Sequence, residues 1–189
     1  ARPARYGDVA VLYRYGTGLE ELEQALRAHG VPYAVTGGAR YYTRQEFRDL
    51  LTALRAIDDP YDEVSVVGAL RSPFFGHSDE DLLAHVAAGG RFDYRSGSPE
   101  NAPRLGEAFA TLRRLHELRR VAAPAQVLAE LFEATQAAAI YALKPYGERR
   151  VANLLKVQET ARALAEARRG TFGGLVEWLR TRAEAEAAE

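Results

Sequence analysis

A double glycine followed by two tyrosines forms one group of residues whose types suit a functional contact. Gly37-Gly38 allows positive φ angles and close backbone approach, which is typical of a turn, and such a turn is a candidate hinge. Tyr41 and Tyr42 follow, and aromatic rings can stack on the bases of a single strand. Alternatively, a ring packs into the core beneath the next helix. We expect such packing for one of the two tyrosines and leave the other open.

An arginine at the end of an apolar run is a second candidate. Residues 8–14 are apolar and flanked by turn-forming residues, which is typical of a buried strand in a parallel sheet. Arg14 ends this run, where α/β folds place functional groups. It can contact a phosphate or form a structural ion pair, and the sequence favours neither. Thr17 in the following loop is a candidate N-cap, with Glu20 as its capping-box partner.

The sequence lacks the common motifs of nucleotide binding and catalysis. It has no G-x-x-x-x-G-K-[ST] loop and no G-x-S-x-G elbow. Its four histidines lack H-x-x-x-H spacing, and the absence of cysteine excludes thiolate ligands and thiol nucleophiles. The acidic residues within 58–63 are better explained by a helix stop and a favourable charge at the next helix start. We therefore assign no catalytic residue, no metal ligand and no cofactor site to this chain.

The composition is that of an ordinary globular protein, with 189 residues, 47% hydrophobic and 27% charged. The lack of cysteine fits a cytoplasmic location. The net charge of −1 provides no global field that would attract DNA. Arginine makes up 23 of the 25 basic residues and suits phosphate contacts, but GC-rich coding explains this bias more simply. Because the chain begins at Ala1 and has no methionine, we expect a piece of a longer protein.

The elements that must position these residues are a small α/β part and a helical body. Strands at 8–14 and 31–35 with a helix at 19–29 predict a βαβ unit. Two strands cannot cover themselves, so we expect self-association through the incomplete sheet. A helix at 44–57 follows, and we place the domain boundary between residues 58 and 59. Further helices are expected at 62–71, 78–87, 104–121, 124–137, 147–169 and 172–186. The fold class is thus mainly α with a small α/β part.

Helix starts carry their own local patterns. Thr43 is a possible N-cap for the helix at 44–57, and we favour Glu46 as its capping-box partner over a pair with Arg40 or Arg44. Later starts are predicted at Asp62, Ser78, Pro124 and Thr171. The tail at 182–189 is expected to be helical, solvated and uncapped.

Three segments in order carry a family resemblance. They are D-V-A-V-L-Y-R at 8–14, G-G-A-R-Y-Y-T-R-Q-E-F-R-D-L-L at 37–51 and L-R-S-P-F-F-G-H-S-D-E-D-L-L at 70–83, with R-R-V-A-N-L-L-K at 149–156 in support. Together they resemble the superfamily 1 DNA helicases of the UvrD/Rep/PcrA type, closest to the AddA/RecB helicase–nuclease branch. The resemblance implies that residues 1–58 begin the second RecA-like motor domain. Residues 59–189 would then be its inserted helical subdomain.

The resemblance also implies roles for particular residues. Candidates for contact with DNA or the motor cleft are Arg14, Thr17, Tyr41, Tyr42, Arg44 and Gly76, and the hinge would be Gly37 and Gly38. Gly76 lies where the family carries a Gly-Ile-Gly duplex-binding loop. However, Asp79, Glu80 and Asp81 follow it, and Ser78 as an N-cap explains the same stretch structurally. Duplex binding and simple capping therefore remain alternatives.

The implied function is that of a fragment of an ATP-dependent 3′–5′ DNA helicase acting in repair and recombination. ATP and Mg would bind elsewhere in the parent, whose partners would be single-stranded and junction DNA and the remaining helicase domains. The fragment would contribute a DNA-binding or regulatory surface and the hinge, without ATPase activity. The alternative is a non-catalytic helical module for protein interaction or autoinhibition. Arginine pairs at 113–114, 119–120, 149–150 and 168–169 suit solvated faces or, if they converge, a track for DNA.

Overall fold

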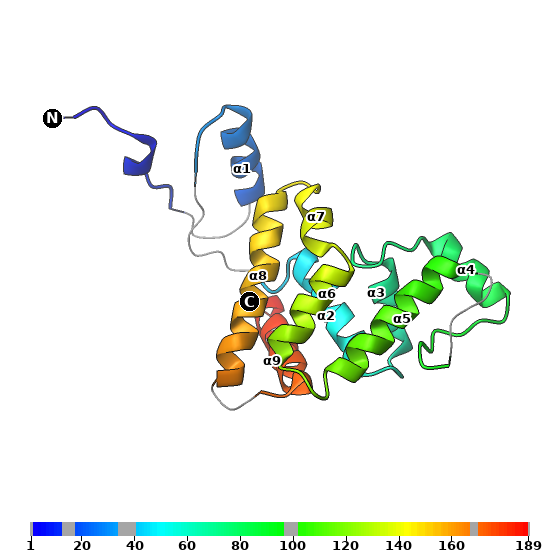
Figure 1. Cartoon of the computed structure of the whole chain (residues 1–189). Coiled ribbons are helices and arrows are strands. Elements are labelled where there is room, and N and C mark those ends of the chain that lie inside the picture. Colours follow the sequence, from blue (N-terminus) through cyan, green and yellow to red (C-terminus); the bar gives the residue numbers. More distant parts are fainter. Residues whose placement is uncertain (1, 13–17, 34–40, 97–101, 167–169, 189) are drawn as a thin grey trace. The chain divides into compact units, whose positions relative to one another are not determined.

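The computed structural model describes residues 2–12, 18–33, 41–96, 102–166 and 170–188. Its contacts divide the chain into two compact units, Ala1–Tyr41 and Tyr42–Glu189, which are described separately (Figure 1). Arg14, Thr17, Gly37 and Gly38 lie outside the described residues.

The first unit contains a 3-10 helix at Tyr6–Asp8 and the helix α1 at Leu19–Ala28. Asp8 accepts hydrogen bonds from the guanidinium of Arg2 at 2.6 Å and from the backbone N–H of Arg5 at 2.9 Å. The helix α1 ends where the sequence predicted, because Gly30 adopts the left-handed conformation with φ of 64°.

The predicted βαβ unit is not supported. Asp8 ends the 3-10 helix, residues 9–12 and 31–33 form no strand, and residues 13, 14, 34 and 35 lie outside the described part of the chain. A strand exists only when its backbone groups pair with a neighbour, and the described part of the chain offers these segments no sheet to join. The apolar pattern was therefore compatible with a strand but did not suffice to form one.

In the described residues of the second unit, every regular element is a helix. Its helices are α2 (Gln45–Asp58), α3 (Glu63–Arg71), α4 (Asp79–Ala87), α5 (Pro103–Leu118), α6 (Pro124–Ala134), α7 (Ala137–Ala142), α8 (Gly147–Glu166) and α9 (Phe172–Ala187). The mainly α prediction is confirmed, although the helix expected at 124–137 ends at Ala134 and is followed by α7 as a separate short helix. Gln136 takes a positive φ of 52° and turns the chain between α6 and α7. None of the described helices is long and apolar enough to cross a lipid bilayer.

Most predicted helix starts are confirmed by their capping bonds. Asp62 accepts from the N–H of Ser65 at 3.0 Å, Ser78 from that of Asp81 at 3.1 Å, and Thr171 from that of Gly174 at 3.1 Å. Pro124 occupies the first turn of α6. Thr43 is not the N-cap of α2, since that helix begins at Gln45 and Arg44 holds the cap position.

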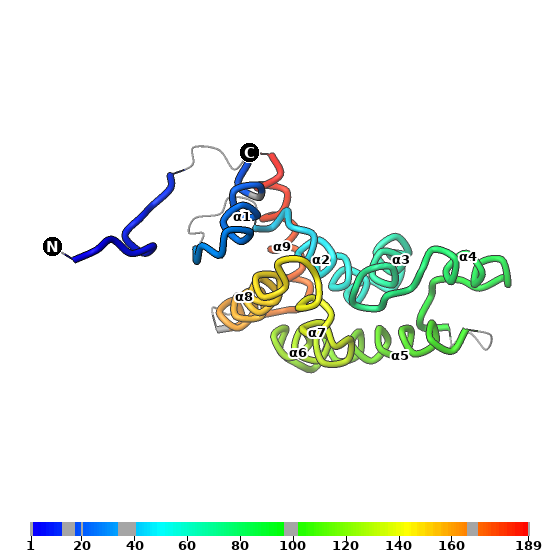
Figure 2. Tube along the Cα trace, turned by 90° about the horizontal axis from the view of Figure 1, so that it is seen from above, coloured from blue at the N-terminus to red at the C-terminus, as the bar shows by residue number. Residues whose placement is uncertain are grey.

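Helix α2 lies at the centre of the helical unit. It contacts α3, α5, α8 and α9. Figure 2 shows α2 between α9 and α3, with α8 and α5 lower in the view. Leu50, Leu54 and Ile57 on its apolar face are fully buried. The sequence placed α2 in the first domain, with a boundary between residues 58 and 59, whereas by contacts it packs in the second unit. Its assignment to a motor domain stays a prediction.

Candidate functional site

The start of α2 is where several candidate residues meet. Tyr42 packs its ring edge-on against Phe47, with centroids 4.9 Å apart, and against Trp178 of α9 at 6.2 Å. Burial raises the pKa of the Tyr42 hydroxyl; the charge of Arg182 opposes this shift and that of Glu186 adds to it. Tyr42 is therefore a packed tyrosine of the kind expected for one member of the pair, while Tyr41 closes the first unit.

The C-terminal helix holds the backbone that leads into α2. One carboxylate oxygen of Glu186 accepts hydrogen bonds from the N–H groups of Tyr42 and Thr43, the latter at 3.0 Å. This residue lies in the tail predicted to be solvated and uncapped, and that expectation is wrong for Glu186, which is half-buried. Its carboxylate satisfies amides just before the helix, where α2 has no side-chain cap of its own.

Glu46 is a buried ion-pair partner rather than a capping residue. Its side chain is almost entirely enclosed, with the residue 3% exposed, and it accepts from Arg150 Nη1 at 3.0 Å and Asn153 Nδ2 at 2.6 Å. Both donors lie on α8 within the R-R-V-A-N-L-L-K segment. Two of the segments quoted for the sequence resemblance, 37–51 and 149–156, thus meet in space, and the favoured capping role of Glu46 is wrong.

One turn further along α2, Asp49 extends this buried polar network. It accepts from the hydroxyl of Tyr141 at 2.8 Å and from Gln45 Nε2 at 2.7 Å. Burial, followed by the negative charge of Asp49, raises the pKa of Tyr141, so that its phenol remains a neutral donor. The polar face of α2 is therefore bonded to α7 and α8, and its chemistry is structural.

The Gly76 loop is built by capping interactions. Gly76 adopts a φ of 66°, and its N–H donates to the carbonyl of Ser72 at 2.8 Å. Phe74 before it is buried and packs near Tyr141 with centroids 5.6 Å apart. Ser78 and Asp81 form the predicted capping box of α4. Because this helix start already holds a carboxylate, it is a poor place for a DNA phosphate.

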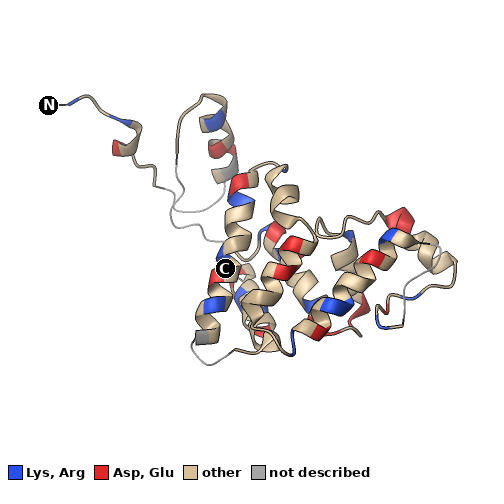
Figure 3. Cartoon of the chain, viewed as in Figure 1, with Lys and Arg blue, Asp and Glu red and all other residues tan. Residues whose placement is uncertain are grey.

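One member of each described arginine pair is used inside the protein. Arg113 donates to the carbonyl of Tyr94 at 2.8 Å, and Arg119 to that of Asp58 at 2.9 Å. Arg150 is bound to Glu46, while residues 168–169 lie outside the described part of the chain. Figure 3 shows basic and acidic positions interspersed over the helices. The pairs therefore brace helix packing more than they build a continuous basic track.

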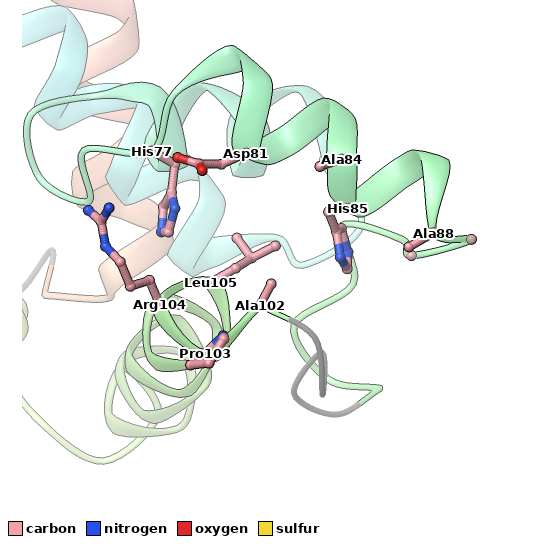
Figure 4. A pocket seen from close by; sticks show the side chains of 11 residues that line it. His77, Asp81, Ala84, His85, Ala88, Ala102, Pro103, Arg104 and Leu105 are labelled. Carbon is pink, nitrogen blue, oxygen red and sulfur yellow. The ribbon is translucent and has the colours of Figure 1, made fainter.

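A cavity of about 610 Å³ lies between α4 and the start of α5 (Figure 4). Sequence reasoning missed it, since its polar members come from a loop and two helices. Its lining includes His77, Asp81, His85 and Arg104. Within the described residues, no group of three or more histidine, aspartate or glutamate side chains is arranged to hold a metal ion.

Comparisons with known proteins agree on one relationship. Residues 2–86 match the family described as UvrD-like helicase C-terminal domain. The chain is 30% identical, over 95% of its length, to ATP-dependent helicase/nuclease proteins of Leuconostoc mesenteroides and Geobacillus thermodenitrificans. Over 39% of its length it is 45% identical to the ATP-dependent DNA helicase UvrD1 of Mycobacterium tuberculosis. It spans 15% of the first two relatives and 10% of the third.

Proposed function

Because the chain belongs to the UvrD-like helicases, we propose that it is a segment of an ATP-dependent DNA helicase that moves 3′–5′ and serves repair and recombination. The match over residues 2–86 carries this proposal. The spatial pairing of Glu46 with Arg150 and Asn153 supports it, since these residues come from segments quoted for the resemblance. The helicase names belong to the relatives, of which this chain spans a small share.

In this proposal the segment supplies a surface and a pivot, while ATP and Mg bind elsewhere in the parent. The sequence has no phosphate-binding loop of the Walker type. A purified sample of the 189-residue chain should therefore show no Mg-dependent ATP hydrolysis above buffer, with or without single-stranded DNA. Clear hydrolysis that copurifies with the chain would overturn this division of roles.

The hinge is proposed at Gly37-Gly38, before the start of α2. Support comes from the helix itself, which is held by α7, α8 and α9 through Tyr141, Arg150 and Glu186. A helix bonded in this way moves with the helical unit. Replacing both glycines by alanine should therefore reduce unwinding by the full-length parent while leaving its affinity for single-stranded DNA within about twofold. Unchanged unwinding would contradict a hinge at Gly37-Gly38.

DNA contact is proposed for the candidates before and around α2, namely Arg14, Thr17, Tyr41, Tyr42 and Arg44, and more weakly for Gly76. The test is binding of single-stranded and duplex oligonucleotides by the chain over a salt series. Arg44→Gln should weaken binding and lower the salt slope by about one, because one phosphate contact is lost. Arg120→Gln, an exposed arginine beyond the end of α5, serves as the control. Equal effects of both variants on DNA binding would contradict a specific phosphate contact of Arg44.

The second candidate function is a protein-interaction or autoinhibitory module without DNA binding of its own. The inward use of Arg113, Arg119 and Arg150 favours it. The two functions separate in one experiment. The interaction module is supported if the chain does not bind DNA at low salt but does bind the remaining motor domains of the parent.

Self-association is proposed through residues 8–14 and 31–35, which we expect to become strands only when further strands are supplied. The apolar residues Val9, Val11 and Leu12 are exposed in this chain. Sedimentation should show a dimer at high concentration, and Val11→Lys should shift it to monomer. A strict monomer for the unmodified chain would contradict this.

A further inference from the structure

The start of α5, like those of α2, α6 and α7, has no hydrogen bond from a side-chain cap. Ala102 at its N-cap has no side-chain oxygen to accept a hydrogen bond, and its first turn holds no acidic residue. Helices α3, α4 and α9 are each capped by a side chain. The first amides of a helix lack partners within the helix and carry a partial positive charge. At α5 these amides, on Arg104 and Leu105, belong to residues that line the cavity.

His77 provides a second and independent observation in the same cavity. The residue is 7% exposed, and across the described residues its imidazole forms no hydrogen bond. Only its backbone is fixed, through an N–H that donates to the carbonyl of Leu70 at 2.9 Å. Because this unbonded ring lines the cavity, a group bound there can reach its nitrogens. Burial, then the charge of Arg104, lowers the pKa of His77 against the opposing charge of Asp81.

The hydrogen-bond donors at this end of the cavity suit an anion, against one negative charge in the lining, the carboxylate of Asp81. Figure 4 shows the Arg104 side chain extending toward the imidazole of His77, with Asp81 beside the ring. Within the described structure Arg104 forms no ion pair, so its five N–H donors are available. The Asp81 carboxylate is already bound by the backbone N–H of Ser78 at 3.0 Å and by its hydroxyl at 2.8 Å.

The other end of the cavity is a wall rather than a second polar site. His85 Nε2 lies 3.1 Å from the carbonyl oxygen of Arg91, and its ring packs against Phe92 and Phe109. Ala84, before His85, and Ala88, beyond it, add apolar surface to this wall. The cavity volume of about 610 Å³ is larger than that of a bare oxyanion and lies in the range of small-molecule pockets.

We propose that this cavity binds a phosphate group, held by Arg104, His77 and the first amides of α5. A planar guanidinium matches two phosphate oxygens, and a helix start offers amides to a third. The rest of the phosphate-bearing molecule lies along Ala84 and Ala88. The phosphate comes either from a free phosphate compound or from a nucleic-acid backbone. This site goes beyond the proposed function, and it holds for either source.

Nuclear magnetic resonance titration of the 189-residue chain tests the proposal. The probes are inorganic phosphate, adenosine monophosphate and a short single-stranded oligonucleotide, with ionic strength held constant by chloride. Saturable shifts of the Arg104 and Leu105 amides are expected, together with a rise in the pKa of His77 when the anion binds. Saturation by phosphate and the mononucleotide alone identifies a free compound as the source. Saturation by the oligonucleotide identifies a nucleic acid.

Variants separate binding from structure. Arg104→Gln should weaken binding at least about tenfold, while Arg120→Gln, a control of the same type away from the cavity, should leave it within about twofold. His77→Phe keeps a ring in place and removes its nitrogens, so it too should weaken binding. Should His77→Phe fail to fold, the exposed Arg104 variant still decides. Shifts that grow linearly with all three probes, or that survive Arg104→Gln unchanged, overturn the proposal.

Discussion

Two groups of buried polar side chains in the helical unit are in opposite states. Around the start of α2, Glu46 and Asp49 accept bonds from α2, α7 and α8. In the cavity between α4 and α5, His77 is buried without a bond to its ring from any described residue. Burial alone therefore does not separate structural from functional polar groups in this protein. The state of their hydrogen bonds does, because a closed network rigidifies and an open one can accept a ligand.

The largest effect is expected from opening the closed network. Glu46→Ala removes the acceptor of Arg150 and Asn153 and leaves a mostly enclosed guanidinium unpaired. The free energy of unfolding in urea should fall by about 3 kcal/mol, the cost of breaking a buried ion pair from one side. Glu80→Ala, at an exposed acidic position of α4, should change it by less than about 0.5 kcal/mol. Similar losses in both variants would mean that the network is not closed.

A second change alters the wall of the open cavity. An added Cβ at Gly90 would lie 2.2 Å from the His85 ring, which Phe92 and Phe109 hold in place. Gly90→Ala should therefore cost about 2 kcal/mol of unfolding free energy through overpacking. Gly170→Ala is the matched control, since its Cβ would meet Ala165 at an ordinary 3.4 Å. An unchanged free energy of unfolding in Gly90→Ala would show that the His85 ring can shift to make room for the added Cβ.

A third change removes one bond of the closed network. Tyr141→Phe should lower the free energy of unfolding by about 1–2 kcal/mol, because Asp49 loses one donor but keeps Gln45. Tyr61→Phe, at an exposed tyrosine, should cost less when both variants are unfolded in urea.

The same tyrosine predicts a dependence on pH. The pKa of Tyr141 is raised in the folded state, so above about pH 10 the unfolded chain loses this proton first. Stability should be constant with respect to this group below that pH and fall above it. Urea unfolding at rising pH should show a shallower decline for Tyr141→Phe than for the unmodified chain. If the free energy of unfolding fell equally with pH in both proteins, a group other than Tyr141 would be responsible for the loss.

The smallest effect is expected at the edge of the network. Glu186→Ala removes an acceptor from the N–H groups of Tyr42 and Thr43, which resembles the loss of a helix cap. It should cost about 1 kcal/mol. Glu184→Ala, on the same helix, breaks only an exposed pair with Arg180 and should cost less than about 0.5 kcal/mol. The order of the two losses in thermal unfolding checks the assignment.

Local patterns in the sequence predicted local features of the fold. Asp62, Ser78 and Thr171 were identified as helix starts because a capping bond spans only three residues. The strands predicted at 8–14 and 31–35 are not supported by their described residues, because pairing needs a partner that a local pattern does not supply. The break at Gln136 carries no glycine or proline, so nothing in the composition marked it.

The candidate site depended on pairs that are distant along the chain. Glu46 meets Arg150 across 104 positions, and Thr43 meets Glu186 across 143. No spacing rule reaches so far, so Glu46 was assigned to its nearest plausible role, the cap. The cavity was likewise beyond prediction, since the distance between His77 and Arg104 is set by how α4 packs near α5.

The bonds at the start of α2 also determine how the helical unit responds to mechanical load. A force applied to the chain at Tyr42 reaches α9 through Glu186, α8 through Arg150 and α7 through Tyr141. These links come from three different helices, and they meet the chain just before α2 or within its first two turns. A force applied at this point is therefore shared among the three helices. We expect the helical unit to move as one body before any single helix unfolds.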